Sequence, residues 1–401
     1  MGSSVRVKSA VVISPSEPTP SCVLPLSALD SQLFLRFTIE YLLVYKPSPA
    51  LDHLATSARL KSALAKALVP YYPFAGRVRP RPGPDASGLE VLCRAQGAVF
   101  IEAFSDRYTA NDFIDKAPKT VTHWRKFLSL YTQDVLKGSP PLVVQLTWLN
   151  DGAAAVGVGI NHCICDGIGS AEFLNYFADL ASGKSPAPKP VWNRHILSPR
   201  PIRPNKPSPI ILPEFNPVPD LCNFMTRVST DLKPTSITFD RRRLHELQQN
   251  AARSASQLSE SHSHTCFEVL AAHVWRSWAR ALGFPSNQRV KLLFSINVRN
   301  RVKPGIPEGY YGNAFVLGCA VSERKGCPES VGVLIVSQWS RLGLERVDFG
   351  AGKPVNVGPV LCDRYCLFLP VNNQREAVKV MLAVPSSAVD HYQYLLTATH
   401  L

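Results

Sequence analysis

The sequence has 401 residues, of which 45% are apolar and 18% are charged, and its formal net charge is +14. This composition is typical of a globular protein with a large buried interior, and it excludes disordered, collagen-like and coiled-coil chains. A length of this size predicts two domains of roughly 150 to 200 residues each.

The sequence also bears on location and partners. The first residues, MGSSVRVKSA, have no apolar signal core, and the longest near-apolar run, 153–160, is too short to span a membrane. Ten scattered cysteines form no disulfide framework, so we expect reduced thiols in the cytoplasm. The positive net charge predicts an anionic partner. Because no nucleic-acid motif appears, we expect a phosphate-bearing small molecule rather than nucleic acid.

The elements of the first half begin with a helix. Apolar residues at helical spacing (Leu54, Ala58, Leu60, Leu64 and Leu68) predict a helix over 51–68 that ends before Pro70. A turn rich in proline and glycine follows, and it leads to a strand around 89–93.

A hairpin and a helix follow. Alternating apolar residues predict strands over 141–149 and 153–160, and Asn150-Asp151-Gly152 between them is a good hairpin turn. The segment 168–181 then reads as a helix, with Gly183 as its C-terminal stop. The second strand of the hairpin therefore runs directly into the segment NHCICDGIG.

Eleven prolines between Pro186 and Pro219 exclude a regular helix or central strand there and predict an extended crossover. Strands and helices resume after it. We expect a mixed α/β protein with two similar halves. The predicted elements of the second half are a strand at 237–239, helices over 241–254 and 265–282, and a strand over 290–296.

The best candidate site is the segment from His162 to Gly167, which directly follows a buried strand. A histidine with an ordinary pKa near 6.5 can accept a proton at physiological pH. Asp166 lies four residues later, and Gly167 allows a tight exit from the sheet. Three interpretations of His162 compete at this stage: a satisfied core histidine, a metal ligand beside Cys163 and Cys165, and a general base. Alternation points the two thiols away from His162, which disfavours a metal, but the residues alone leave the choice open.

Six motifs carry a resemblance that covers nearly the whole chain, in family order. The sequence resembles the plant BAHD acyltransferases, which depend on coenzyme A and are related to chloramphenicol acetyltransferase. One motif would be weak, but six in register are specific. They are LSALD (26–30), LVPYYPFAGR (68–77), NHCICDGIG (161–169), NVRNR (297–301), YYGN (310–313) and DFGAGKP (348–354).

The resemblance implies two chloramphenicol acetyltransferase-like domains, at 1–185 and 231–401, joined by the crossover 186–230. A channel between them brings acyl-coenzyme A and the acceptor to His162 from opposite faces. His162 would act as general base in a direct transfer to a small-molecule alcohol. No metal and no cofactor would be needed, since the thioester is already activated. The family also implies a cytoplasmic monomer.

The resemblance also assigns supporting residues around the motifs. Asp166 would point away from the channel and pair with Arg299, or alternatively with Arg301, to hold the loop in shape. Asp348, Gly350 and Gly352 would form a structural loop remote from the base. At that loop Ala351 stands where the family has a tryptophan.

Substrate contacts are implied more loosely. Ser295 and Arg253 are candidates for coenzyme A, although Arg253 equally fits a solvated helix face. Arg341 matches a position that touches the acceptor in some relatives, and a surface arginine on a strand is the plainer interpretation.

One interval departs from the family pattern. Only 35 positions separate Asn313 from Asp348, so the segment 314–347 is predicted to be shortened. This departure and Ala351 keep a second hypothesis open: a noncatalytic family member that acts as a partner or regulator of another acyl-processing enzyme. The intact His162 argues for the enzyme.

Overall fold

The computed structural model describes residues 4–83, 88–114, 116–130, 135–187, 189–198, 231–257, 263–284, 289–322, 331–363 and 365–398. Most of the predicted crossover, residues 199–230, lies outside the described residues. None of the helices within the described ranges has the length and hydropathy of a membrane span.

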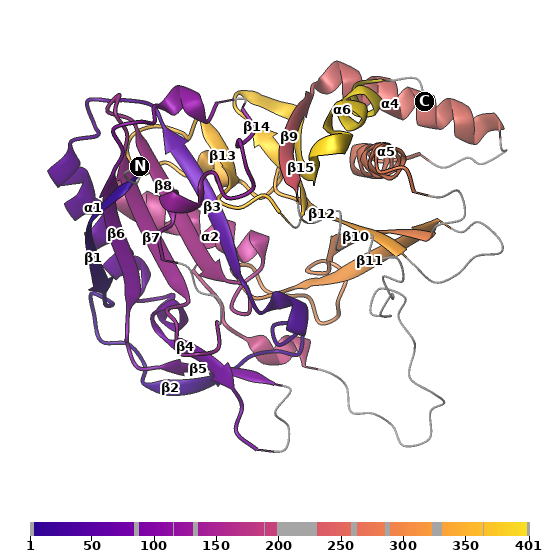
Figure 1. Cartoon of the computed structure of the whole chain (residues 1–401). Coiled ribbons are helices and arrows are strands. Elements are labelled where there is room, and N and C mark those ends of the chain that lie inside the picture. Colours follow the sequence, from indigo (N-terminus) through magenta and orange to yellow (C-terminus); the bar gives the residue numbers. More distant parts are fainter. Residues whose placement is uncertain are drawn as a thin grey trace, which may run out of the picture.

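The first half of the molecule is built on a six-stranded sheet, with a small three-stranded sheet below it (Figure 1). Its order is β1 (Arg6–Ile13), β6 (Ala98–Phe104), β7 (Leu142–Trp148), β8 (Ala154–Asn161), β3 (Thr38–Tyr45) and β13 (Asn356–Pro359). The small sheet has the order β2 (Cys22–Pro25), β5 (Leu89–Cys93) and β4 (Arg77–Pro80).

The second half is built on another six-stranded sheet, which lies beside the first in Figure 1. Helices α4 (Arg241–Gln257), α5 (Cys266–Ala281) and α6 (Val389–Thr397) pack with it around a second apolar core. Its strand order is β11 (Phe315–Ser322), β10 (Arg289–Asn297), β12 (Val331–Gln338), β14 (Cys366–Val371), β15 (Gln374–Pro385) and β9 (Leu232–Phe239).

The predicted hairpin forms the centre of the first sheet. Every residue of β7 and β8 is buried, because β6 and β3 flank them and helices α1 (His53–Ala67) and α2 (Gly167–Ala181) belong to the same core. Gly152 in the turn has φ 78, the left-handed conformation that the Asp-Gly pair predicts. This packing fixes the end of β8, where the candidate site begins.

The helices follow their sequence signals with one correction. The Asp52 side chain accepts the N–H of Ala55 and caps α1, and Leu60 and Leu64 are buried as predicted. Leu54 and Ala58, which we also placed on the apolar face, are instead exposed, Leu54 by 75%. Both lie on the side of the helix away from the core.

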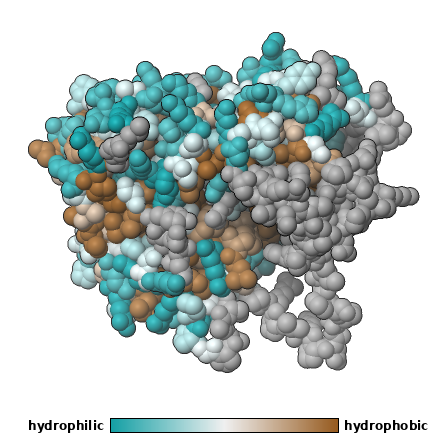
Figure 2. Space-filling model, in the orientation of Figure 1, coloured by the Kyte–Doolittle hydropathy of each residue, from teal (hydrophilic) through white to brown (hydrophobic). Residues whose placement is uncertain are grey.

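The two halves of the structure do not correspond to two continuous segments of the sequence. Strand β13 belongs to the second half of the sequence, yet it pairs antiparallel with β3 and completes the first sheet. The segment 231–401 therefore does not form one spatial unit. Figure 2 shows apolar side chains in the middle of the same face, where the two sheets of Figure 1 meet, and hydrophilic side chains over its upper part.

Candidate active site

His162 lies in the turn between the end of β8 and the start of α2, where both halves of the molecule meet. Its backbone N–H donates to the carbonyl of Phe37 at 2.9 Å, and its carbonyl accepts from Nδ2 of Asn313 at 2.7 Å. Its ring lies 5.1 Å from the ring of Phe37 and 5.8 Å from that of Phe315. The residue as a whole is half-buried rather than fully enclosed.

The surroundings of His162 favour its neutral form. Burial lowers the pKa of its imidazole below the ordinary value of 6.5, because a charged ring is poorly solvated there. The hydrogen bond to its own backbone, the charge of Asp166 and the side chain of Asn313 act in the opposite direction without cancelling this effect. A neutral imidazole at physiological pH is the form that a general base requires.

The carboxylate of Asp166 makes contacts that hold the structure together. Its carboxylate caps α2 by accepting the N–H of Gly169 at 2.9 Å, and it also accepts the N–H of Ala314 at 3.0 Å. Arg299 binds it with both terminal nitrogens, at 2.8 and 2.9 Å. This is the first of the two partners that the resemblance implied, whereas Arg301 is exposed. The pair joins the first half to the second.

The two cysteines of the motif have partners of their own. Sγ of Cys163 donates to the carbonyl of Leu35 at 3.3 Å, and Sγ of Cys165 lies 3.2 Å from the hydroxyl of Ser170. Burial raises the pKa of each thiol to about 12, so both are protonated and are poor metal ligands. Across the described ranges, no cluster of three or more potential ligands is arranged to hold a metal ion.

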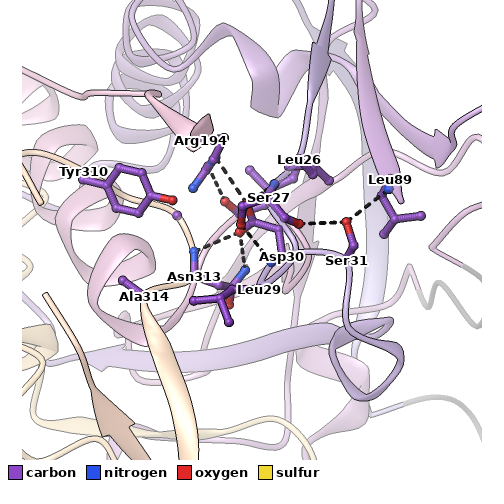
Figure 3. Close-up of polar contacts among 12 residues, drawn as sticks. Leu26, Ser27, Leu29, Asp30, Ser31, Leu89, Arg194, Tyr310, Asn313 and Ala314 are labelled. Carbon is purple, nitrogen blue, oxygen red and sulfur yellow. Dashed lines mark hydrogen bonds and ion pairs between the residues drawn. The ribbon is translucent and has the colours of Figure 1, made fainter. Parts of the chain in front are cut away.

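The aspartate of the LSALD motif and the asparagine of YYGN, to which we gave no role, contact each other (Figure 3). Asp30 is completely buried, and its Oδ1 accepts both the backbone N–H of Asn313 at 2.9 Å and Nδ2 at 2.8 Å. Asn313 is the residue that holds the carbonyl of His162. Two motifs far apart in the sequence thus act on one turn.

The crossover contributes a buried cation to this site. Nη2 of Arg194 donates to the carbonyl of Ile164 at 2.6 Å, and Nε lies 3.7 Å from the carboxylate of Asp30. The guanidinium stacks 4.2 Å from the ring centre of Trp192 and 4.9 Å from that of Tyr311. Sequence reasoning missed Arg194, because a proline-rich segment predicts only a linker.

Comparisons with known proteins agree with this arrangement. A sequence model of the Transferase family matches residues 3–326 and 318–394. The chain is 30% identical to taxadien-5-alpha-ol O-acetyltransferase of Taxus chinensis, over 98% of this chain and 96% of that protein. The chain belongs to the BAHD acyltransferase family. It is 29% identical to omega-hydroxypalmitate O-feruloyl transferase of Arabidopsis thaliana, over 97% of this chain and 92% of the relative.

The fold of this BAHD acyltransferase is similar to that of vinorine synthase. The crystal structure of that protein has a TM-score of 0.74 and 20% identity, with 96% of each chain covered. The predicted family and the two-part chloramphenicol acetyltransferase-like fold are therefore confirmed. The alignment to the Taxus chinensis relative runs over 444 positions, more than the 401 residues here, so the relative has residues that this chain lacks. The family model matches in two segments that overlap at 318–326, inside the interval that we predicted to be shortened.

The DFGAG loop of this BAHD chain packs on the first half. Oδ1 of Asp348 accepts the backbone N–H groups of Gly350, Ala351 and Gly352 at 2.8, 3.1 and 2.9 Å. The φ angles of Gly350 and Gly352 are 89 and 90, in the left-handed region that favours glycine.

Helix α2 separates this loop from the base. The hydroxyl of Ser182, at the C-terminal end of the helix, donates to the carbonyl of Asp348 at 2.6 Å, while His162 precedes its N-terminal end. The helix has 15 residues, so the loop lies about 22 Å from the turn of His162.

The predicted substrate contacts are all on the surface. Ser295 is exposed on β10, opposite Leu317 of β11. Arg253 is exposed on α4, a helix that packs against α5, β9 and β15 rather than against the elements around His162. Arg341 is exposed in the turn after β12. The interpretation of Arg341 as a surface residue is therefore correct, but its placement on a strand is wrong. None of the three has a described contact with His162, and their roles stay predictions.

Proposed function

We propose that this chain transfers an acyl group from acyl-coenzyme A to the hydroxyl of a small-molecule alcohol, with His162 as the general base. The acyl group would be hydroxycinnamoyl, benzoyl, acetyl or fatty acyl, and the chain would act as a cytoplasmic monomer without a cofactor. One observation supports the mechanism above all: His162, a half-buried residue whose imidazole pKa is lowered by burial, lies where the two halves of the molecule meet. The acetyl and feruloyl transfers named for its relatives support the donor classes.

In the proposed reaction, His162 takes the proton of the acceptor hydroxyl as its oxygen attacks the thioester carbonyl. The tetrahedral oxyanion then collapses, the carbon–sulfur bond breaks, and the leaving coenzyme A thiolate receives from His162 the proton that came from the acceptor hydroxyl. A positioned base typically contributes about 10² to 10⁴ in rate. Holding both substrates in line between the two halves adds to this, because the reaction becomes effectively unimolecular.

The test is release of free thiol from acyl-coenzyme A thioesters in the presence of a panel of alcohols. We expect alcohol-dependent release that falls by about 10² to 10⁴ in His162→Ala, with an unchanged melting temperature. His391→Ala is the matched control, because His391 is exposed on α6 and should leave turnover intact. Full activity in purified His162→Ala would refute the proposal. Binding of a protein partner without thiol release would favour the noncatalytic hypothesis.

A further inference from the structure

A pair of thiols in the small three-stranded sheet has no part in the proposed reaction (Figure 1). Cys22 begins the edge strand β2, and Cys93 ends the central strand β5. The two strands are antiparallel, and their register sets Cys22 directly opposite Cys93. Opposite residues of an antiparallel pair have their side chains on the same face of the sheet. Both cysteines are free thiols in this structure.

The backbone hydrogen bonds place the two cysteines at a distance that a disulfide can span. The N–H of Leu26 donates to the carbonyl of Leu89 at 3.0 Å, and this bond continues the register of β2 and β5. Because hydrogen-bonded pairs recur at every second position, Cys22 and Cys93, four positions away, also form such a pair. Its Cα atoms are about 5.5 Å apart, within the range of roughly 4.4 to 6.8 Å that disulfides show. The two thiols are also within hydrogen-bonding reach of each other.

The two thiols differ in their access to solvent. Cys22 is half-buried, whereas Cys93 is only 1% exposed. Burial raises the pKa of the Cys93 thiol to about 12, so this group is protonated and reacts slowly with a dissolved oxidant. The hydroxyl of Tyr72 forms a hydrogen bond with the Cys22 thiol. An oxidant from solution therefore meets Cys22 first, and Cys93 lies beside it as the second thiol.

We propose that Cys22 and Cys93 are a modification site, where a reversible disulfide forms with glutathione disulfide as the oxidant. The Cys22 thiolate attacks one sulfur of glutathione disulfide, and the first glutathione leaves as a thiolate that takes up a proton. Cys93 then attacks the sulfur of Cys22 in this mixed disulfide, and its proton passes to the second glutathione as that leaves. Two cysteine thiols are oxidised, and one glutathione disulfide is reduced to two thiols. The second step is intramolecular, because the strand register holds Cys93 next to the mixed disulfide.

The geometry of the sheet makes this bond easy to reduce. Opposite Cβ atoms in a sheet are about 4.5 to 5.5 Å apart, whereas a disulfide brings them to about 3.5 to 4.5 Å. Closing the bond therefore draws β2 toward β5, which is possible because β2 is an edge strand. The resulting strain makes the disulfide more reducible. We expect two thiols in a reducing glutathione pool and a disulfide when the pool becomes oxidised.

The disulfide would fasten a segment that leads toward the candidate active site. Strand β2 ends at Pro25, and the LSALD motif follows it directly, with Asp30 eight residues after Cys22. The bond closes a loop of about 70 residues, which restricts the unfolded chain. We therefore expect oxidation to stabilise the first half of the molecule. This inference does not depend on the function proposed above.

The test is disulfide mapping of the folded, full-length chain after incubation with oxidised and reduced glutathione at several ratios. Free thiols are then alkylated, and the chain is digested with trypsin. Cys22 falls in peptide 9–36 and Cys93 in peptide 78–94, and neither peptide contains another cysteine. We expect the two peptides to be linked when oxidised glutathione is in excess and to separate when reduced glutathione is in excess. Recovery of Cys22 as a glutathione adduct, or of both cysteines as alkylated thiols, would overturn the proposal.

The melting temperature gives a second measurement. The oxidised protein should melt about 5 °C higher than the reduced protein, and Cys93→Ser should lose both the link and this rise. Cys266→Ser is the matched control, because Cys266 is a half-buried cysteine on α5 and its loss should change neither. A rise that persists in Cys93→Ser would contradict the assignment to this pair. If Cys93→Ser does not fold, the peptide map of the wild type still decides. None of these measurements requires acyl transfer, so the two proposals fail separately.

Discussion

Asp166 and Asp348 each fix a turn of the backbone, but their partners come from different distances along the chain. Asp348 accepts N–H groups that are two, three and four residues away, within its own loop. Asp166 binds one group three residues away, and also Arg299 and Ala314, which are 133 and 148 residues away. The first turn is a local structure, whereas the second exists only when both halves of the molecule are folded together.

The difference has an energetic consequence. The DFGAG loop is partly exposed, so water can replace a hydrogen bond that is lost there. The side chains of Asp166 and Arg299 are only 6% and 13% exposed, so neither charge can be solvated if the other is removed. Identical substitutions at the two aspartates should therefore give different results.

The largest effect is expected for Asp166→Asn, which leaves Arg299 as an unpaired buried charge. We expect the free energy of unfolding to fall by about 3 to 5 kcal/mol, as measured by chemical denaturation. The double variant Asp166→Asn/Arg299→Gln should recover part of this loss, because no unpaired charge remains. An unchanged unfolding midpoint in the single variant would contradict the role assigned to the pair.

The same change at Asp348 should cost less. Asparagine retains an oxygen at Oδ1 that can accept from the three N–H groups, and only the contribution of the charge is lost. We expect Asp348→Asn to lower the free energy of unfolding by about 1 kcal/mol in the same assay. If the losses at Asp348 and Asp166 are equal, the distinction between a local and a long-range turn is wrong.

The smallest effect concerns pH. Because burial lowers the pKa of His162 below 6.5, the ring should stay neutral, and active as a base, at pH values where an exposed histidine is already protonated. We therefore expect the acidic limb of a plot of kcat/KM against pH to have its midpoint below 6.5. A midpoint above 6.5 would mean that a negative charge, rather than burial, dominates around the ring.

The sequence predicted those elements whose signals are local. Strand β5 begins and ends at the predicted residues, and α2 begins one residue early, at Gly167. The Thr265–Glu268 capping box places the start of α5 where we expected it. We did not predict β15 or α6 individually, because these C-terminal elements gain their stability from packing with β14, β9 and α5, which a local pattern does not contain.

At the site too, residues with a local signal were predicted, and residues brought together only by the fold were missed. His162 stood out because it follows a buried strand, and the family resemblance supplied Arg299. Asp30, Arg194 and Asn313 come from three distant segments, and nothing in their immediate neighbours indicates a common target. The motifs LSALD and YYGN were the only available signal, and without the fold they had no physical interpretation.

The pairing of β13 with β3 affects how the chain folds while it is being synthesised. A ribosome releases residues 38–45 long before 356–359, so one edge of β3 stays without its partner during most of synthesis. Residues 40–45 of that strand are buried in the finished protein, and an unpaired apolar edge is a site of aggregation. The edge of β3 therefore stays open to pairing with other strands until almost nine-tenths of the chain has emerged.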